Sequence, residues 1–161
     1  MLNMVSHKLD LYALLHGDSS KFTGDCDLVF TNPYAPLPKQ LQNKPMLICD
    51  FTERKAIAEE RCGTTLETVS EWYNGKNSIW SGNVKNINVD LSDLMPDPPG
   101  WFPEELVYRL LRVYGKPGFI VWDGFMGRGT VGKVALRMGM KFIGIDKILQ
   151  RVEMAAGYVE E

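Results

Sequence analysis

The feature that most constrains the fold is a glycine-rich stretch near the end of the chain, "FIVWDGFMGRGTVGKVALRMGMKFIGID" (Phe119 to Asp146). "FIVWD" predicts a buried strand, "GFMGRG" a tight turn, "TVGKVALRMG" a helix that ends at Gly139, and "KFIGID" a second strand. A strand, loop, helix and strand in this order build two parallel strands joined by a right-handed crossover. The sequence therefore predicts an α/β fold.

The glycines of this unit, together with an acidic residue, indicate a ligand site. Gly127 and Gly129 let the backbone approach a ligand closely and allow a tight turn. Asp146 ends the second strand 19 residues after Gly127, where such units place a carboxylate for the hydroxyls of a ribose. A ribose-bearing cofactor is the natural inference. Because Gly132 completes a G-x-G-x-x-G pattern, a nicotinamide or flavin cofactor stays open, as does a purely structural role in close helix-strand packing.

The rest of the chain predicts further strands and helices in alternation, which also favours an α/β fold. The predicted elements are a helix or strand within 9–18, strands within 26–32 and 44–51, a helix over 52–63 with Thr52 as its N-cap, a short helix over Leu66–Tyr73, a hairpin at "YNGKN", and helices over 102–115 and 147–161.

Composition restricts the classes of partner and compartment. The 161 residues are 45% hydrophobic, which suits one globular domain, and the net charge of −2 provides no global positive field for nucleic acid. Three cysteines without a CxxC pair and only two histidines predict no metal site. No apolar run approaches a membrane span and no signal-like N-terminus is visible, so we expect a cytoplasmic protein without membrane contact.

The glycine-rich stretch resembles the S-adenosylmethionine-binding motif of amino-methylating DNA methyltransferases, Asp-Pro-Phe-x-Gly-Ser-Gly-Thr. The matching residues are Asp123, Phe125, Gly127, Gly129 and Thr130. Gly124 replaces the proline of the pattern and Arg128 replaces the serine.

A second stretch, "WFPEELVYRLL", is similar to the motif in which this family places an aromatic-proline step before a helix beside the cofactor. The resemblance therefore implies a cofactor pocket that includes Trp101, Phe102 and Pro103. By the same resemblance Asp146 would bind the ribose and Asp18 would line the adenine side. Asp123 would orient the glycine loop or meet the cofactor's ammonium group.

The stretch "TNPYAPLP" resembles the family's catalytic motif, (Asp/Asn/Ser)-Pro-Pro-(Tyr/Phe/Trp), with one proline fewer. The resemblance implies that the Asn32 amide oxygen and the Pro33 carbonyl accept hydrogen bonds from an amino group, and that Tyr34 stacks on a flipped base. Taken without the resemblance, the same residues stop a strand and form a stiff turn.

The order of the two motifs, catalytic first and cofactor last, resembles the permuted β class of these enzymes. It implies a Rossmann-like fold with a seven-stranded, mostly parallel sheet and helices on both faces. We expect one methyltransferase-like domain over 1–161, with a catalytic half (1–62), an irregular substrate-side region (63–100) and a cofactor-binding half (101–161).

The resemblance implies S-adenosylmethionine-dependent methylation of an exocyclic amino group of adenine or cytosine in DNA, in a single strand or as a flipped base. The long target-recognition segment of such enzymes is missing, so a homodimer or a partner subunit would supply target recognition. Two alternatives stay open: a non-catalytic cofactor-binding or partner subunit, and methylation of RNA or a small molecule.

Overall fold

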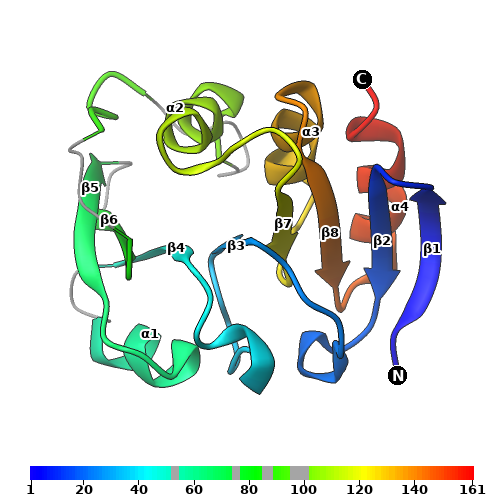
Figure 1. The fold of residues 1–161 in the computed structure, drawn as a ribbon, viewed down its shortest axis with the longest axis horizontal. Helices are drawn as coiled ribbons and strands as arrows, with labels where there is room; N and C mark the ends of the chain where they lie inside the picture. The colour runs from blue at the N-terminus through cyan, green and yellow to red at the C-terminus, as the bar shows by residue number, and fades with distance from the viewer. Residues whose placement is uncertain (52–54, 74–76, 85–88, 95–101) are drawn as a thin grey trace.

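A computed structural model describes residues 1–51, 55–73, 77–84, 89–94 and 102–161 of the chain, which form a sheet with helices against it (Figure 1). The strands are β1 (Asn3–Lys8), β2 (Tyr12–His16), β3 (Leu28–Thr31), β4 (Met46–Phe51), β5 (Glu67–Tyr73), β6 (Asn77–Gly82), β7 (Ile120–Asp123) and β8 (Lys141–Asp146). The helices are α1 (Lys55–Cys62), α2 (Glu104–Tyr114), α3 (Thr130–Arg137) and α4 (Leu149–Tyr158), with short 3₁₀ turns at Ser19–Lys21 and Lys39–Leu41. None of the helices in these ranges is long and apolar enough to cross a bilayer.

The sheet has a parallel centre and antiparallel edges. Its order is β1-β2-β8-β7-β3-β4-β6-β5. Every neighbouring pair from β2 through to β4 is parallel, whereas β1 and the β5–β6 pair add antiparallel strands at the two edges. The expected mostly parallel α/β sheet is confirmed, but within the described ranges it has eight strands rather than the expected seven.

The connections diverge at the centre of the sheet. From β3 the chain passes to β4 on one side, while from β7 it passes through α3 to β8 on the other side (Figure 1). β3 and β7 nevertheless pair directly, with Leu28 opposite Val121. In open α/β sheets ligands bind beyond the carboxyl ends of the strands where the connections diverge. The topology therefore directs attention to the residues that follow β3 and β7.

Apolar side chains cover both faces of the sheet. On one face α2, α3 and α4 bury Leu106, Leu110, Val134 and Val152 against the strands. On the other face α1 and the segments that carry the 3₁₀ turns pack in a second core around Trp122. The expectation of helices on both faces is confirmed.

The middle of the chain differs from its prediction. Leu66–Tyr73 does not form a helix, because Glu67–Tyr73 is strand β5, paired antiparallel with β6. Its residues Thr68, Val69, Trp72 and Tyr73 are β-branched or aromatic and favour a strand once a partner strand is present.

The predicted hairpin is confirmed, because β5 and β6 pair antiparallel. Its turn, 74–76, and the predicted N-cap Thr52 lie outside the described residues. Strand β1, at the opposite edge of the sheet, was not predicted.

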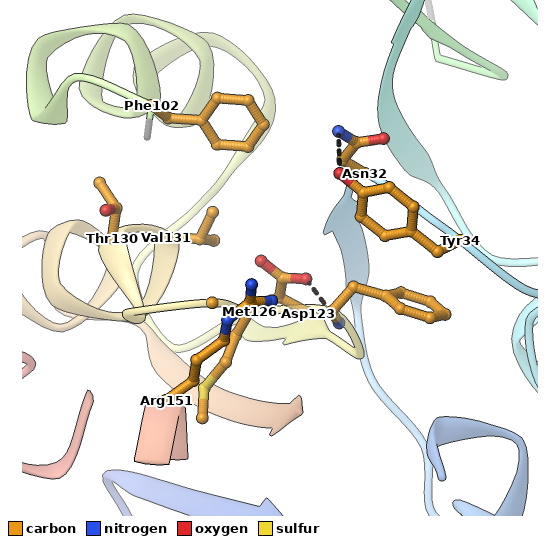
Figure 2. A pocket seen from close by; sticks show the side chains of 10 residues that line it. Asn32, Tyr34, Phe102, Asp123, Met126, Thr130, Val131 and Arg151 are labelled. Atoms are coloured by element: carbon orange, nitrogen blue, oxygen red, sulfur yellow. Dashed lines mark hydrogen bonds between the residues drawn. The ribbon is translucent and has the colours of Figure 1, made fainter. Parts of the chain in front are cut away.

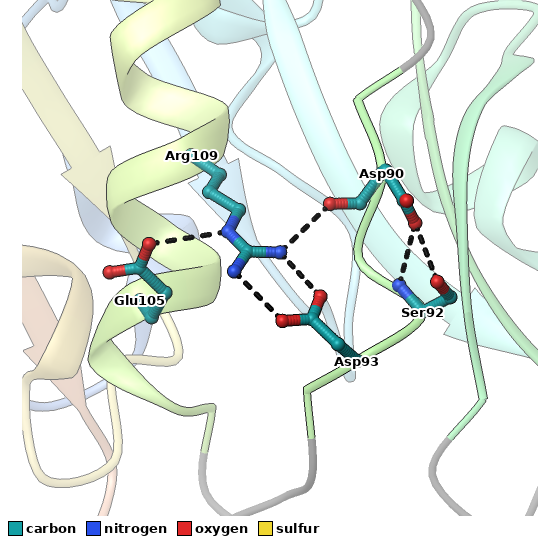
Figure 3. A network of polar contacts seen from close by, with 5 residues as sticks. All are labelled: Asp90, Ser92, Asp93, Glu105 and Arg109. Atoms are coloured by element: carbon teal, nitrogen blue, oxygen red, sulfur yellow. Dashed lines mark hydrogen bonds and ion pairs between the residues drawn. The ribbon is translucent and has the colours of Figure 1, made fainter.

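Residues 89–94 are held against α2 by one arginine (Figure 3). The Arg109 guanidinium donates two hydrogen bonds to the Asp93 carboxylate, of 2.6 and 3.0 Å, and one to the Asp90 carbonyl. Its Nε donates to Glu105, one turn earlier on the helix. The side chain of Leu91 is buried in the adjacent core. This bidentate contact connects residues 89–94 to α2.

Close packing between α3 and β8 depends on Gly132. A Cβ built at this position would overlap the ring of Phe142, which is fully buried. Of the glycines in the glycine-rich stretch, Gly132 therefore has the structural role in close helix-strand packing. Gly157 in α4 is the opposite case, because a Cβ there would meet no atom within 4 Å.

We expect Gly132→Ala to lower the free energy of unfolding by ~1–3 kcal/mol, because the Phe142 ring must move to admit a methyl group. Gly157→Ala is the matched control and should raise it by up to about 1 kcal/mol, since alanine favours the helix and has room. Urea unfolding followed by circular dichroism measures both. Equal effects of the two substitutions would contradict the packing role of Gly132.

Candidate functional site

A cavity of about 300 Å³ lies where the connections of the sheet diverge, at the carboxyl ends of β3 and β7. It is lined by Asn32, Tyr34, Phe102, Asp123, Phe125, Met126, Gly127, Thr130, Val131 and Arg151. Figure 2 shows Asn32 and Tyr34 on one side and Phe102, Thr130 and Val131 on the other. Both predicted motifs therefore contribute to one cavity, although they are separated by about ninety residues in the chain.

The glycine loop has the backbone conformation that its sequence predicts. Gly127 and Gly129 have φ angles of 56° and 88°, a region that side chains strongly disfavour. Gly129 is the N-cap of α3. The Gly127 N–H donates to the Asp146 carboxylate at 3.0 Å, and the Ile148 N–H donates to its other oxygen at 2.9 Å. Asp146 is buried and anchors the loop through these hydrogen bonds, and it is not among the residues that line the cavity.

The two departures from the family pattern have contacts of their own. A Cβ at Gly124 would overlap the indole ring of Trp122, so this chain has no room for the proline of the pattern. The Arg128 guanidinium lies 4.9 Å from the centre of the Tyr158 ring, and its Nε donates to the Thr130 hydroxyl at 3.2 Å. Arg128 thus connects the glycine loop to α4.

Asp123 is a buried carboxylate in the wall of the cavity. It accepts a hydrogen bond of 2.6 Å from the Thr31 hydroxyl and one of 3.0 Å from the Phe125 N–H. Burial raises the pKa of Asp123 to about 7, the charge of Asp146 acts in the same direction, and the two hydrogen bonds oppose the rise. The charge of this wall therefore changes near neutral pH.

The loop after β3 presents an amide and an aromatic ring. Asn32 is half-buried, and its side-chain nitrogen lies 3.5 Å from the Tyr34 hydroxyl. Tyr34 is 68% exposed, and its ring packs against that of Phe125 in an edge-type arrangement with the ring centres 6.2 Å apart. Pro33 is buried outside the cavity lining, and its carbonyl accepts a hydrogen bond of 2.9 Å from Arg61.

Phe102 reaches the cavity from the start of α2, which a polar cluster fixes to α3 and α4. Lys133 donates to Glu104 at 2.9 Å, and the Tyr158 hydroxyl donates to the same carboxylate at 2.7 Å. The Lys133 ammonium also lies over the Tyr158 ring. Because Lys133 is buried and paired, this contact is a structural one that holds the first turn of α2 in place.

Two further predicted residues, Pro103 and Asp18, are not among the residues that line the cavity. Pro103 is the N-cap of α2, next to Phe102. Asp18 is exposed beyond β2 and caps the first 3₁₀ turn, where the Ser20 N–H donates to its carboxylate and lowers its pKa. Trp101 lies outside the described residues. Three cavity residues were not predicted: Met126, Val131 and Arg151.

Of these three, Met126 and Val131 lie inside the quoted motif, but Arg151 has no sequence signal. It lies in the first turns of α4, 3.9 Å from the Asp146 carboxylate. Within the described ranges, no three His, Cys, Asp or Glu side chains are grouped so that they could hold a metal ion.

The sequence of the chain is similar to the proteins of one known family. Residues 24–157 match the DNA methylase family. The chain is 30% identical over 104 residues to the type II methyltransferase M2.LlaDCHI of Lactococcus lactis subsp. cremoris, covering 63% of this chain and 38% of that protein. It is 30% identical over 109 residues to M2.DpnII of Streptococcus pneumoniae, covering 66% and 40%. The chain thus spans about two fifths of the length of these curated relatives.

The fold also matches solved structures. The crystal structure of the M1.HpyAVI–SAM complex superposes with a TM-score of 0.71 at 17% identity, over 92% of this chain and all of that one. This similarity confirms the Rossmann-like methyltransferase fold with its mostly parallel sheet.

The elevated pKa of Asp123 predicts a stability that depends on pH. Between the usual pKa near 4 and about 7, the folded state binds a proton that the unfolded state does not, so the free energy of unfolding should fall as pH rises. Asp123→Asn removes this dependence. The stability of the wild type relative to this variant should therefore fall between pH 4 and 8, by on the order of a few kcal/mol.

Urea unfolding at a series of pH values measures this difference. Asp10→Asn is the matched control, because Asp10 is exposed in a turn with a φ of 63°, a conformation that asparagine tolerates. The prediction is wrong if both substitutions change the pH dependence alike.

Proposed function

This chain belongs to the DNA methylase family, and on that premise we propose that it transfers a methyl group from S-adenosylmethionine to an exocyclic amino group of adenine or cytosine in DNA. One observation carries the proposal. Asn32, from the loop after β3, and Gly127, from the loop after β7, line the same cavity. In this proposal, Asn32 accepts a hydrogen bond from the amino group, and Gly127 lets the cofactor approach the backbone of the same cavity.

The cavity residues suit this cofactor. Phe102, Met126 and Val131 supply apolar walls, and the backbone of Gly127 admits a ligand without interference from a Cβ. The Thr130 hydroxyl and the Asp123 carboxylate add polar groups beside them. A volume of about 300 Å³ lies at the lower end of the range for small-molecule sites. Ionised Asp123 would favour a ligand that carries positive charge.

S-adenosylmethionine, when bound, supplies an electrophilic methyl group. The chain's part is to hold the amine in line with it, since positioning accounts for much of the barrier in such a displacement. The Asn32 amide oxygen would accept an amino hydrogen and stabilise the positive charge that develops on the nitrogen. Tyr34, which lines the cavity and is largely exposed, would stack on a base that has left its duplex.

The Pro33 carbonyl has a smaller part in this proposal than the sequence implies. Arg61 already donates a hydrogen bond to it, so one of its two lone pairs is engaged. Asn32 is therefore the principal acceptor for the amine.

The domain organisation, the partners and the cellular compartment of the protein are also proposals. We propose one methyltransferase-like domain over 1–161, with 63–100 on the substrate side. Because the net charge of −2 provides no global positive field for DNA, a second copy or a partner subunit would contribute to its recognition. A reducing cytoplasm suits the buried thiol of Cys26.

Asn32→Ala should leave cofactor affinity within about threefold and lower methyl transfer by ~10²-fold or more, because the amine loses its acceptor. Labelled S-adenosylmethionine with a panel of DNA, RNA and nucleotide acceptors measures transfer, and calorimetry measures binding. Asn43→Ala, at an exposed position, is the control. Transfer that survives Asn32→Ala would refute the mechanism, and cofactor binding by the wild type without transfer to any acceptor would refute the activity.

Asp146→Ala should weaken cofactor binding by about tenfold or more, because the Gly127 and Ile148 N–H groups lose their buried acceptor and the glycine loop loses its anchor. Asp146→Asn keeps one acceptor oxygen and should have a smaller effect. Calorimetric titration with S-adenosylmethionine gives both affinities. Wild-type affinity in Asp146→Ala would show that the loop does not need this anchor.

A further inference from the structure

One residue outside the cavity, Arg61, holds the loop that carries Asn32. The Arg61 Nη1 donates to the Pro33 carbonyl at 2.9 Å. The backbone carbonyl of Arg61 accepts a hydrogen bond of 2.8 Å from the Leu37 N–H. The loop from Asn32 to Leu37 is therefore attached near its start and at its end to a single residue of α1.

The helix that carries Arg61 is itself firmly placed. Ala58 and Cys62 are buried in the core beneath β4. The helix stops at Gly63, whose N–H donates to the Glu59 carbonyl at 2.9 Å. The Glu59 carboxylate accepts the Leu66 N–H at 2.8 Å, which fixes the chain beyond the helix. A guanidinium on such a support can restrain a loop that it touches.

The hydrogen bond from Arg61 to the Pro33 carbonyl restrains the residues on both sides of Pro33. The peptide plane that contains the Pro33 carbonyl also contains the nitrogen of Tyr34, and only Pro33 separates it from Asn32. Pro33 restricts its own φ, and Pro36 restricts the backbone of Ala35 before it, but no ring restricts the backbone of Tyr34. A charged donor at 2.9 Å fixes this plane and so limits the directions in which Asn32 and Tyr34 can point.

Arg61 acts through the loop rather than on a ligand in the cavity. It is half-buried and is absent from the residues that line the cavity, whereas Asn32 and Tyr34 are among them. Its charged hydrogen bond also draws electron density from the Pro33 carbonyl, which weakens that oxygen as an acceptor for a second donor. The Asn32 oxygen is then the better acceptor of the two.

We propose that Arg61 is a positioning residue that clamps the Asn32–Leu37 loop and directs the Asn32 amide toward the amino group of the substrate. This inference rests on the proposed function for its effect on transfer. Its effect on the loop itself can be measured without any substrate or cofactor.

The test compares Arg61→Gln with Arg61→Lys. In Arg61→Gln, amide hydrogen exchange over 32–37 should become about tenfold faster while exchange over 125–130 stays unchanged, because only the clamped loop is released. The kcat for methyl transfer should fall by ~10–100-fold through misplacement of the amine acceptor. The Kd for S-adenosylmethionine should stay within about twofold, because the cofactor side of the cavity is untouched.

Arg61→Lys should restore part of the exchange protection and part of kcat, since an ammonium group can also donate to the Pro33 carbonyl. Arg112→Gln, the same substitution at an exposed position near the end of α2, is the matched control and should change neither.

Three results would overturn the clamp. They are unchanged exchange over 32–37 in Arg61→Gln, faster exchange with an unchanged kcat, or a cofactor affinity that falls in step with kcat. A wild-type chain that transfers no methyl group refutes the proposed function instead, and the exchange comparison alone then decides whether Arg61 holds the loop.

Discussion

The hydrogen bond between Thr31 and Asp123 joins the two halves of the site. It runs from the end of β3 to the end of β7, between residues 92 positions apart in the chain, and both partners are buried. A buried carboxylate must find donors, and the Thr31 hydroxyl supplies one at 2.6 Å. With the two strand ends held together in this way, the loops that follow them open into one cavity.

Each of these two loops is also held from outside the cavity by a charged side chain. The carboxylate of Asp146 accepts the Gly127 N–H, and the guanidinium of Arg61 donates to the Pro33 carbonyl. Backbone groups at a cavity wall would otherwise exchange among several conformations, which costs entropy when a ligand orders them. The residues behind the wall therefore matter as much for the geometry as those that line it.

The sequence predicted the structure correctly where the conformation of a segment depends on its own residues. The glycines at 127 and 129 predict a tight turn with positive φ, and the turn has it, because only glycine adopts that conformation at little cost. It failed at Leu66–Tyr73, where the pattern suggested a helix and pairing with β6 produces a strand. It missed Arg61 and Arg151, because an arginine on an ordinary helix carries no sign of which loop or cavity it will reach. Trp101 lies outside the described residues.

By itself, the sequence determined the two loops and the strands that lead into them, because glycine and proline act on the φ angles of their own residues. It did not determine that these loops share a cavity. That depends on β3 pairing with β7, a contact between distant segments that no local pattern encodes. Only the tertiary structure joined Asp123 to Thr31, Asp146 to the glycine loop and Arg61 to the Asn-Pro-Tyr loop by hydrogen bonds. The physical reason is that buried charges and backbone groups find hydrogen-bond partners across the chain, according to the packing of the sheet.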